Sequence, residues 1–246
     1  HPLLPLYVTG SDSGVVTLWQ YARPKSLGDF AGPSNSSSLT SIQFNSYGDK
    51  LGTCDAQGNF FLYKFDLQPT SFQPQLTMMS SVGSKASAFS FLNLGSVIAT
   101  TGNKPRGFLS IYDTLLPPNK SLLHTDSIGG NIIHYVSRYQ QVILGHKKGK
   151  LTRYDLRMMK VADTIDSRHE NILDLVSDST ETTLVSAGSD GFVRIWDARN
   201  LTLREGIEVV PKKTRNRTVT KREFLDNALF CSTSDGFVKL LRTTTN

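Results

Sequence analysis

The sequence predicts an all-β fold of the β-propeller class, in which four-stranded antiparallel sheets form the blades. Six segments share one pattern: a β-rich run, a turn that ends in glycine, and alternating apolar residues up to an aromatic residue or leucine. The glycines recur at about the length of one propeller blade, and no window has a helical period of useful length. We therefore expect six visible blades of four antiparallel strands, with seven allowed in the parent protein.

Six glycines mark the repeat and lie 44, 49, 42, 42 and 45 residues apart. They are Gly14, Gly58, Gly107, Gly149, Gly191 and Gly236. In the last two repeats an Asp-Gly pair separates two apolar runs. This pair predicts a hairpin with a tight primed turn, because glycine adopts a positive φ without steric cost.

The strand order follows from the runs around each glycine. A strand precedes each turn, and a further strand precedes that one, as 171–177 precedes 183–188. The predicted inner strands are 39–45, 85–92, 131–137, 171–177 and 218–225. Polar, proline-containing stretches at 66–74 and 113–119 are expected to connect the third and fourth strands of two blades.

Length and composition are compatible with one domain over residues 1–246. The chain is 38% hydrophobic, and no apolar run approaches the roughly 20 residues that cross a bilayer. It begins at His1 without an initiator methionine, and the first and last repeats together lack one inner and one outer strand. We therefore expect a fragment of a longer chain, in which strands upstream of residue 1 complete the closure and cover the exposed sheet edges.

One repeat contains four residues that suit a buried hydrogen-bonded network. His169, Ser186, Asp190 and Trp196 occupy the places of the structural tetrad of WD-repeat propellers, which the chain resembles over nearly its whole length. An imidazole, a hydroxyl, a carboxylate and an indole N–H satisfy one another, and each such group left unpaired costs about 1–3 kcal/mol when buried. In the second, third, fourth and sixth repeats, the place of Trp196 is taken by Tyr63, Tyr112, Tyr154 and Leu241, so we expect weaker networks there.

The motifs argue against an enzyme and against a metal or cofactor site. A Ser-His-Asp set is present, but no nucleophile elbow or oxyanion loop accompanies it. Cys54 and Cys231 stand in repeats that are not neighbours, and neither forms a CxxC or Cys/His pattern. We expect both to be buried thiols outside any disulfide, and we expect no cofactor and no metal.

Basic residues concentrate in loops that a propeller gathers on one face. The net charge is +6, and residues 211–222 hold six basic residues and no acidic one. We expect a partner-binding basic rim formed by Lys104, Arg106, Lys147, Lys148, Arg168, Lys212, Lys213, Arg215 and Arg217. The plainer interpretation is a set of solvated basic loops with no ligand.

An acidic partner of such a rim belongs to one of three classes: a protein segment, an anionic membrane surface, or nucleic acid. Nucleic acid has the least support, because no aromatic residues interleave with the basic run and no reader motif is present.

Several tracts resemble one branch of the WD-repeat proteins, the C-terminal propeller of the DmX-like, or rabconnectin, family, whose fungal counterpart is the large subunit of the RAVE complex. The tracts are 1–21, 41–63, 96–103, 111–124 and 229–240. The tract IYDTLLPPNKSLLH (111–124) is the most specific, since blade geometry does not require its Asp-Thr-Leu opening.

The resemblance implies a non-enzymatic scaffold that regulates assembly of the V-type proton ATPase and organelle acidification. It implies V-type ATPase subunits and other assembly-complex subunits as partners, and a cytoplasmic location peripheral to endomembranes. The alternatives are a generic WD-repeat adaptor in a trafficking or ubiquitin-ligase complex, and a basic-rim binder of anionic lipid or RNA.

Overall fold

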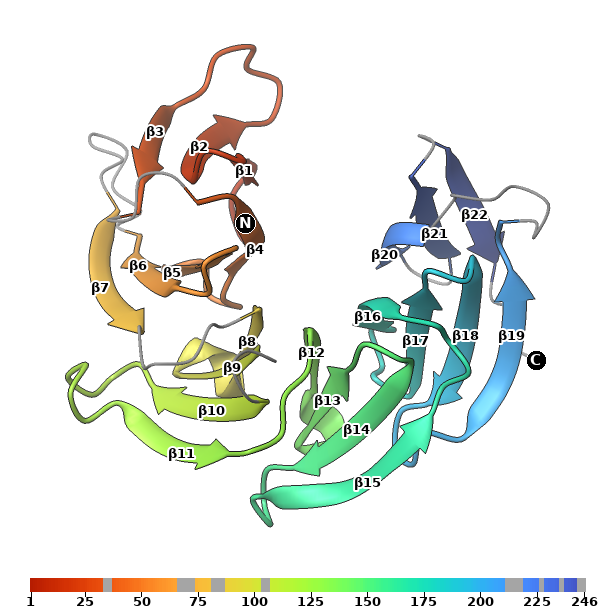
Figure 1. The fold of residues 1–246 in the computed structure, drawn as a ribbon. Helices are drawn as coiled ribbons and strands as arrows, with labels where there is room; N and C mark the ends of the chain where they lie inside the picture. Colours follow the sequence, from red (N-terminus) through yellow and green to blue (C-terminus); the bar gives the residue numbers. More distant parts are fainter. Residues whose placement is uncertain are drawn as a thin grey trace. The chain divides into compact units, whose positions relative to one another are not determined.

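In the computed structural model, the residues whose placement is described form 22 strands arranged in six antiparallel sheets (Figure 1). The structure describes residues 1–32, 37–65, 74–80, 87–102, 107–210, 219–225, 228–234 and 237–242. Within each sheet, strands that follow one another along the chain are hydrogen-bonded neighbours. The sheets are numbered 1 to 6 in chain order. Apart from strands, the described residues contain two single-turn 3₁₀ helices, η1 (Asn93–Gly95) and η2 (Ser137–Tyr139).

The chain divides into two compact units, residues 1–129 (unit 1) and 130–246 (unit 2). Unit 1 contains sheets 1 to 3, and unit 2 contains sheets 4 to 6. The single domain expected over residues 1–246 stays a prediction, as does the closure by upstream strands.

Unit 1 begins with a three-stranded sheet and continues with two four-stranded sheets. Sheet 1 consists of β1 (Leu6–Gly10), β2 (Val15–Gln20) and β3 (Gly28–Ala31). Sheet 2 consists of β4 (Leu39–Phe44), β5 (Lys50–Asp55), β6 (Phe60–Lys64) and β7 (Gln75–Ser80). Sheet 3 consists of β8 (Ala88–Leu92), β9 (Val97–Gly102), β10 (Phe108–Asp113) and β11 (Leu122–Asp126).

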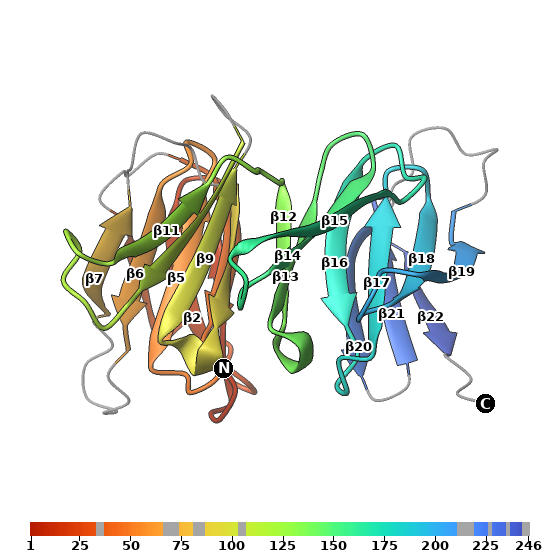
Figure 2. The same ribbon diagram turned by 90° about the horizontal axis from the view of Figure 1, so that it is seen from below.

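Unit 2 contains two four-stranded sheets followed by a three-stranded one. Sheet 4 consists of β12 (Ile132–Val136), β13 (Gln141–Gly145), β14 (Lys150–Asp155) and β15 (Lys160–Asp166). Sheet 5 consists of β16 (Ile172–Ser177), β17 (Thr183–Gly188), β18 (Phe192–Asp197) and β19 (Leu203–Glu208). Sheet 6 consists of β20 (Val219–Leu225), β21 (Ala228–Thr233) and β22 (Val238–Arg242). The outer strands β15 and β19 run obliquely to the inner strands of their sheets, as sheet twist requires (Figure 2).

The predicted strand order is confirmed. The five expected inner strands correspond to β4, β8, β12, β16 and β20, each within three residues at either end. Sheet 1 has no inner strand and sheet 6 no outer strand among the described residues, which agrees with the expected lack of one strand of each kind. The predicted loop at 66–74 falls almost wholly outside the described residues.

The predicted turn type is wrong in detail. At the β17–β18 hairpin the amide of Gly191 donates to the carbonyl of Gly188 at 3.3 Å, and Gly191 has a φ of 78°. Asp190 is not among the residues of positive φ. The connection is therefore a three-residue loop with glycine in the left-handed region, rather than a two-residue primed turn. The second Asp-Gly pair lies outside the described residues.

Apolar layers between adjacent sheets hold unit 1 together. Sheets 1 and 2 enclose one cluster, which contains Leu18 and Phe61, and sheets 2 and 3 enclose another. In the second cluster the rings of Phe60 and Phe89 meet edge to face with centroids 4.9 Å apart. Cys54 is buried in the same cluster, and burial raises the pKa of its thiol, which keeps it protonated.

Unit 2 has the same construction. Trp196 of sheet 5 packs with Ile143 and Leu151 of sheet 4, and Cys231 of sheet 6 packs with Val193 and other residues of sheet 5. Sheet 5 thus buries one face against sheet 4 and the other against sheet 6, which explains why β17 is buried on both sides. In the described part of the chain, no helix has the length and hydropathy that crossing a bilayer requires.

Candidate functional site

Four side chains of sheet 5 form one continuous hydrogen-bonded chain. Trp196 Nε1 donates to Ser186 Oγ at 2.8 Å, and Ser186 Oγ lies 2.8 Å from His169 Nε2. His169 Nδ1 lies 2.8 Å from Asp190 Oδ1. The donors and acceptors alternate correctly when Ser186 donates to Nε2 and His169 carries its proton on Nδ1. The structure thus joins the four residues that the sequence places in the tetrad.

Each side chain is positioned by a different element. His169 lies in the β15–β16 loop, Ser186 on β17, Asp190 in the β17–β18 turn and Trp196 on β18. Because β17 and β18 are paired antiparallel, Ser186 and Trp196 reach the same face of the sheet. The network therefore ties the loop that enters sheet 5 to its central hairpin.

The sequence analysis missed Arg194, a fifth member of this network. Its Nη1 donates to Asp190 Oδ2 at 2.8 Å and also contacts His169. Burial alone would raise the pKa of Asp190, but hydrogen bonds from His169 and Arg194 outweigh it and lower that pKa. A signal was present in the sequence, since Arg194 is two residues from Trp196 on one strand and so shares its face.

The Ser-His-Asp geometry of this network does not provide an accessible nucleophile. Ser186 is fully buried, with no exposed surface, and its oxygen already accepts the indole N–H. A substrate carbonyl has no route to that oxygen while the sheet is folded. The arrangement stabilises the hairpin and offers no chemistry to a ligand.

Other sheets hold smaller polar sets. In sheet 1, Trp19 Nε1 donates to Thr9 Oγ1 at 2.8 Å. In sheet 4, His146 Nε2 lies 2.8 Å from Thr152 Oγ1. In sheet 2, a side-chain hydrogen bond links Tyr63 with Thr53, while burial raises the pKa of Tyr63 to about 12.

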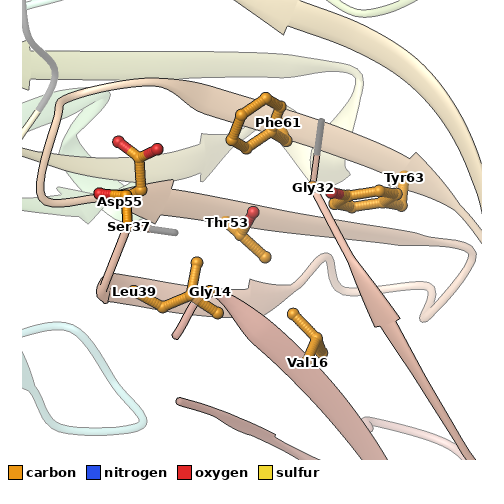
Figure 3. Close-up of a pocket in the computed structure, with 9 residues that line it drawn as sticks. All are labelled: Gly14, Val16, Gly32, Ser37, Leu39, Thr53, Asp55, Phe61 and Tyr63. Atoms are coloured by element: carbon orange, nitrogen blue, oxygen red, sulfur yellow. The ribbon is translucent and has the colours of Figure 1, made fainter. Parts of the chain in front are cut away.

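A small pocket lies beside Thr53 between sheets 1 and 2 (Figure 3). Its volume is about 10 Å³, which is room for about one water molecule. Phe61 and Val16 lie on opposite sides of Thr53, and Asp55 follows it along β5. A space of this volume is too small for a substrate or a cofactor.

Three of the predicted rim residues lie on two adjacent loops of unit 2. Lys147 and Lys148 are in the β13–β14 turn, and Arg168 is in the β15–β16 loop; all three are exposed. The loops meet where the amide of Ser167 donates to the carbonyl of Gly149 at 2.8 Å. Lys148 and Arg168 have φ values of 70° and 61°, in a region that large side chains rarely occupy.

The other rim residues fall outside the described part of the chain. They are Lys104, Arg106, Lys212, Lys213, Arg215 and Arg217. Acidic residues also border the described loops, since Asp166 and Glu170 are exposed on either side of Arg168. The basic rim as a whole stays a prediction.

No group of three or more histidine, cysteine or acidic side chains with the geometry of a metal site occurs among the described residues. His134 is instead held in a structural hydrogen bond, with Nε2 2.9 Å from Ser177 Oγ.

Residues 162–197, which run from β15 through the tetrad hairpin, match the WD40 family, described as WD domain, G-beta repeat. Over 212 residues, or 82% of the chain, the sequence is 29% identical to DmX-like protein 1 of Mus musculus. Over 205 residues, or 80% of the chain, it is 29% identical to DmX-like protein 1 of Homo sapiens. The chain carries a DmX-like WD-repeat domain. It spans 7% of the length of these curated relatives.

Solved structures show the fold of this DmX-like WD-repeat domain. A crystal structure of the computationally designed Ika8 protein superposes with a TM-score of 0.73 at 18% identity, over 97% of this chain and 68% of that chain. A crystal structure of the mitotic checkpoint complex contains a chain that superposes with a TM-score of 0.77 at 14% identity, over 98% and 72%. Together with the repeated sheets, these matches confirm the predicted WD-repeat β-propeller class.

Proposed function

We propose that this DmX-like WD-repeat domain is a non-enzymatic interaction platform in a regulator of V-type proton ATPase assembly and organelle acidification. The observation that carries the proposal is the similarity to DmX-like protein 1 over 82% of the chain. The family resemblance of tracts such as 111–124 supplies the link to the ATPase, and the parent protein would act at the cytoplasmic side of endomembranes.

The geometry supports the binding of partners rather than the catalysis of a reaction. The Ser-His-Asp set is buried within sheet 5, and the space beside Thr53 has room for one water molecule. Exposed loops, by contrast, present large basic side chains to solvent, such as those of Lys148 and Arg168. A rigid array of sheets with ordered loops binds partners without a large ordering cost.

The test is recovery of partners by the full-length parent protein from cells. We expect V-type ATPase subunits among the recovered proteins, and a rise in the pH of acidic organelles when the parent protein is removed. Recovery of only ubiquitin-ligase or trafficking subunits, with organelle pH unchanged, would instead support the generic adaptor function.

A second candidate is a basic-surface binder of anionic lipid or RNA, favoured by the exposed Lys147, Lys148 and Arg168 on adjacent loops. Its test is a pair of charge-reversed variants, one with these three residues changed to Glu and one with Lys212, Lys213, Arg215 and Arg217 changed to Glu. Binding to phosphatidylserine vesicles or to RNA should weaken in both and should fall steeply with salt. Unchanged binding in both variants would remove this candidate.

A further inference from the structure

A hollow of about 310 Å³ opens on unit 1, between the ends of sheets 2 and 3. Its walls come from the β4–β5 turn, the η1–β9 turn and the loop after β10. The residues that line it are Asn45, Tyr47, Asp49, Lys50, Asn93, Gly95, Ser96 and Leu115. Sites for small molecules have volumes of about 300–1,000 Å³. The hollow lies at the lower end of this range, so its size suits one bulky side chain with its backbone better than a cofactor.

Leu115 is held beside the hollow although 73% of its surface is exposed. Its amide donates to Asp113 Oδ1 at 2.8 Å. The preceding Thr114 donates to the carbonyl of Ser96 twice, from its amide and from its hydroxyl, at 2.8 Å in each case. The side chains of Asp113 and Thr114 thus hold the backbone at Leu115, whose apolar side chain stays exposed to solvent. The stability of the fold does not require this exposure.

Tyr47 is the second large exposed side chain of the hollow, with 55% of its surface exposed. It lies in a tight turn in which the amide of Gly48 donates to the carbonyl of Asn45 at 3.1 Å. The φ of Gly48 is 77°, a value that glycine adopts without strain. Asn45 Oδ1 also accepts the amide of Lys50 at 3.0 Å, so the turn is closed on both sides. Exposed tyrosines are frequent anchors of protein interfaces.

Lys50 gives the hollow a polar end. Its Nζ donates to Thr114 Oγ1 at 2.7 Å and, more weakly, to the carbonyl of Gly95 at 3.4 Å. Lys50 is partly buried, and none of the carboxylates that the structure describes forms an ion pair with it. A partly buried ammonium is stabilised by an opposite charge, so a carboxylate brought by a partner would bind there.

Asp49 sets the direction from which that carboxylate arrives. It also lines the hollow, and its Oδ1 accepts the side-chain amide of Asn45 at 2.7 Å. A second carboxylate near Asp49 would be repelled, whereas Thr114 is uncharged and already contacts Lys50 Nζ. The acidic group is therefore favoured on the Thr114 side of Lys50.

We propose that this hollow binds an extended segment of a partner protein that carries a bulky apolar side chain next to an aspartate or glutamate. The apolar side chain lies between Tyr47 and Leu115, and the carboxylate pairs with Lys50. The proposal rests on the scaffold function proposed above, since it names the kind of partner the scaffold takes. It also explains the Asp-Thr-Leu opening of the 111–124 tract: Asp113 and Thr114 position Leu115 and Lys50.

The experiment is selection of random short peptides displayed on phage against the 246-residue chain. Peptides recovered by the wild type should contain an aromatic or large aliphatic residue adjacent to Asp or Glu. A synthetic peptide of that class should bind Leu115→Glu at least about tenfold more weakly, the change that about 1.4 kcal/mol produces. Lys50→Glu should prefer the same peptide with Lys in place of its acidic residue, and Lys50→Gln should lose the preference for either charge.

Leu123→Glu is the matched control, because Leu123 on β11 is 53% exposed and does not line the hollow. Its affinity for the synthetic peptide should equal that of the wild type, and circular dichroism and urea midpoints should show that every variant folds. Equal binding to the wild type and to Leu115→Glu, or selection of peptides without the apolar and acidic pair, would overturn the proposal. Failure of the parent protein to recover ATPase subunits would leave the peptide result unaffected, so the two proposals fail separately.

Discussion

The indole Nε1 of Trp196 donates a hydrogen bond to Ser186 Oγ across 2.8 Å, and Ser186 in turn contacts His169. This contact joins β18 to β17, and His169 carries it on to the β15–β16 loop. The network ends at Asp190 and Arg194, which form an ion pair with Nη1 and Oδ2 2.8 Å apart. Its members depend on one another, so removal of one leaves another buried polar group unsatisfied.

Asp190→Asn should therefore lower the free energy of unfolding by about 2 kcal/mol, because Arg194 loses its carboxylate partner while its side chain is only 11% exposed. Trp196→Phe, which removes one hydrogen bond and keeps most of the ring, should cost about 1 kcal/mol. Urea denaturation measures both. Asp12→Asn, in the exposed turn of sheet 1, is the control and should change stability by less than about 0.5 kcal/mol. A cost for Asp190→Asn no larger than that of the control would contradict the structural role of the network.

His134 should make stability depend on pH. Burial lowers its pKa to about 4, from the usual value of about 6.5. Between these values the unfolded chain binds more protons than the folded one, so stability falls as the pH falls from about 6.5 to 4. The slope from this group is at most about 1.4 kcal/mol per pH unit.

His134→Asn removes the titrating group, so urea midpoints measured from pH 7 to pH 4 should fall less steeply than in the wild type. His124→Asn, on β11, serves as the comparison for loss of a histidine. An identical pH slope in His134→Asn and the wild type would show that His134 does not titrate differently in the folded state.

Gly52 on β5 should not tolerate alanine. An added Cβ would lie 2.4 Å from the ring of Phe89, and that ring is already packed against Phe60 and Phe91. Overpacking of this kind typically costs about 1–3 kcal/mol. Gly206→Ala on β19 is the matched control, because its nearest neighbour would be 3.9 Å away, and it should be neutral or slightly stabilising. Thermal midpoints compare the two, and equal midpoints would refute tight packing between sheets 2 and 3.

Asp155 stabilises the turn after β14. Its Oδ1 accepts the amide of Arg157 at 2.8 Å and that of Met158 at 3.3 Å, and the side-chain hydrogen bond from Arg157 leads the effects that lower its pKa to about 2. The ionised carboxylate therefore stabilises the fold above pH 3.8, and this contribution is lost as the pH falls toward 2.

Asp155→Asn should cost about 1 kcal/mol at pH 7, and the difference from the wild type should shrink as the pH falls below 3.8. Arg157→Ala, which removes a side chain that is 66% exposed, should cost less. Urea denaturation at neutral and acidic pH tests both statements. A larger loss for Arg157→Ala than for Asp155→Asn would show that the ion pair matters more than the backbone amides.

Much of the fold can be predicted from local sequence patterns. The spacing of glycines such as Gly14 and Gly58 predicts the repeat because most of these turns need a positive φ, and both glycines have φ above 80°. Gly107 is an exception among the described residues, since its φ is not positive. The tetrad could also be predicted, since its four residue types can satisfy one another's hydrogen-bonding groups when they stand at these positions of the repeat. The sequence analysis missed Arg194 because an arginine on a strand usually faces water. Its position two residues before Trp196 was a signal that it shares the face of the tetrad, and the structure shows it largely buried beside Asp190.

The hollow beside Tyr47 and Leu115 could not be predicted in the same way. Its residues come from three segments between positions 45 and 115, and no single segment carries a motif for a pocket. The sequence marks the tract after Tyr112 as unusual but does not place it near Lys50. That neighbourhood arises from the packing of sheet 2 against sheet 3.

By itself, the amino-acid sequence determined the repeat, the strand order and the residues of the buried network, because period-two alternation and turn chemistry act over a few neighbouring residues. Only the tertiary structure decided which loops meet, how Arg194 is paired, and where Leu115 lies relative to Lys50. These are distances between segments far apart in the chain, and they depend on how whole sheets pack.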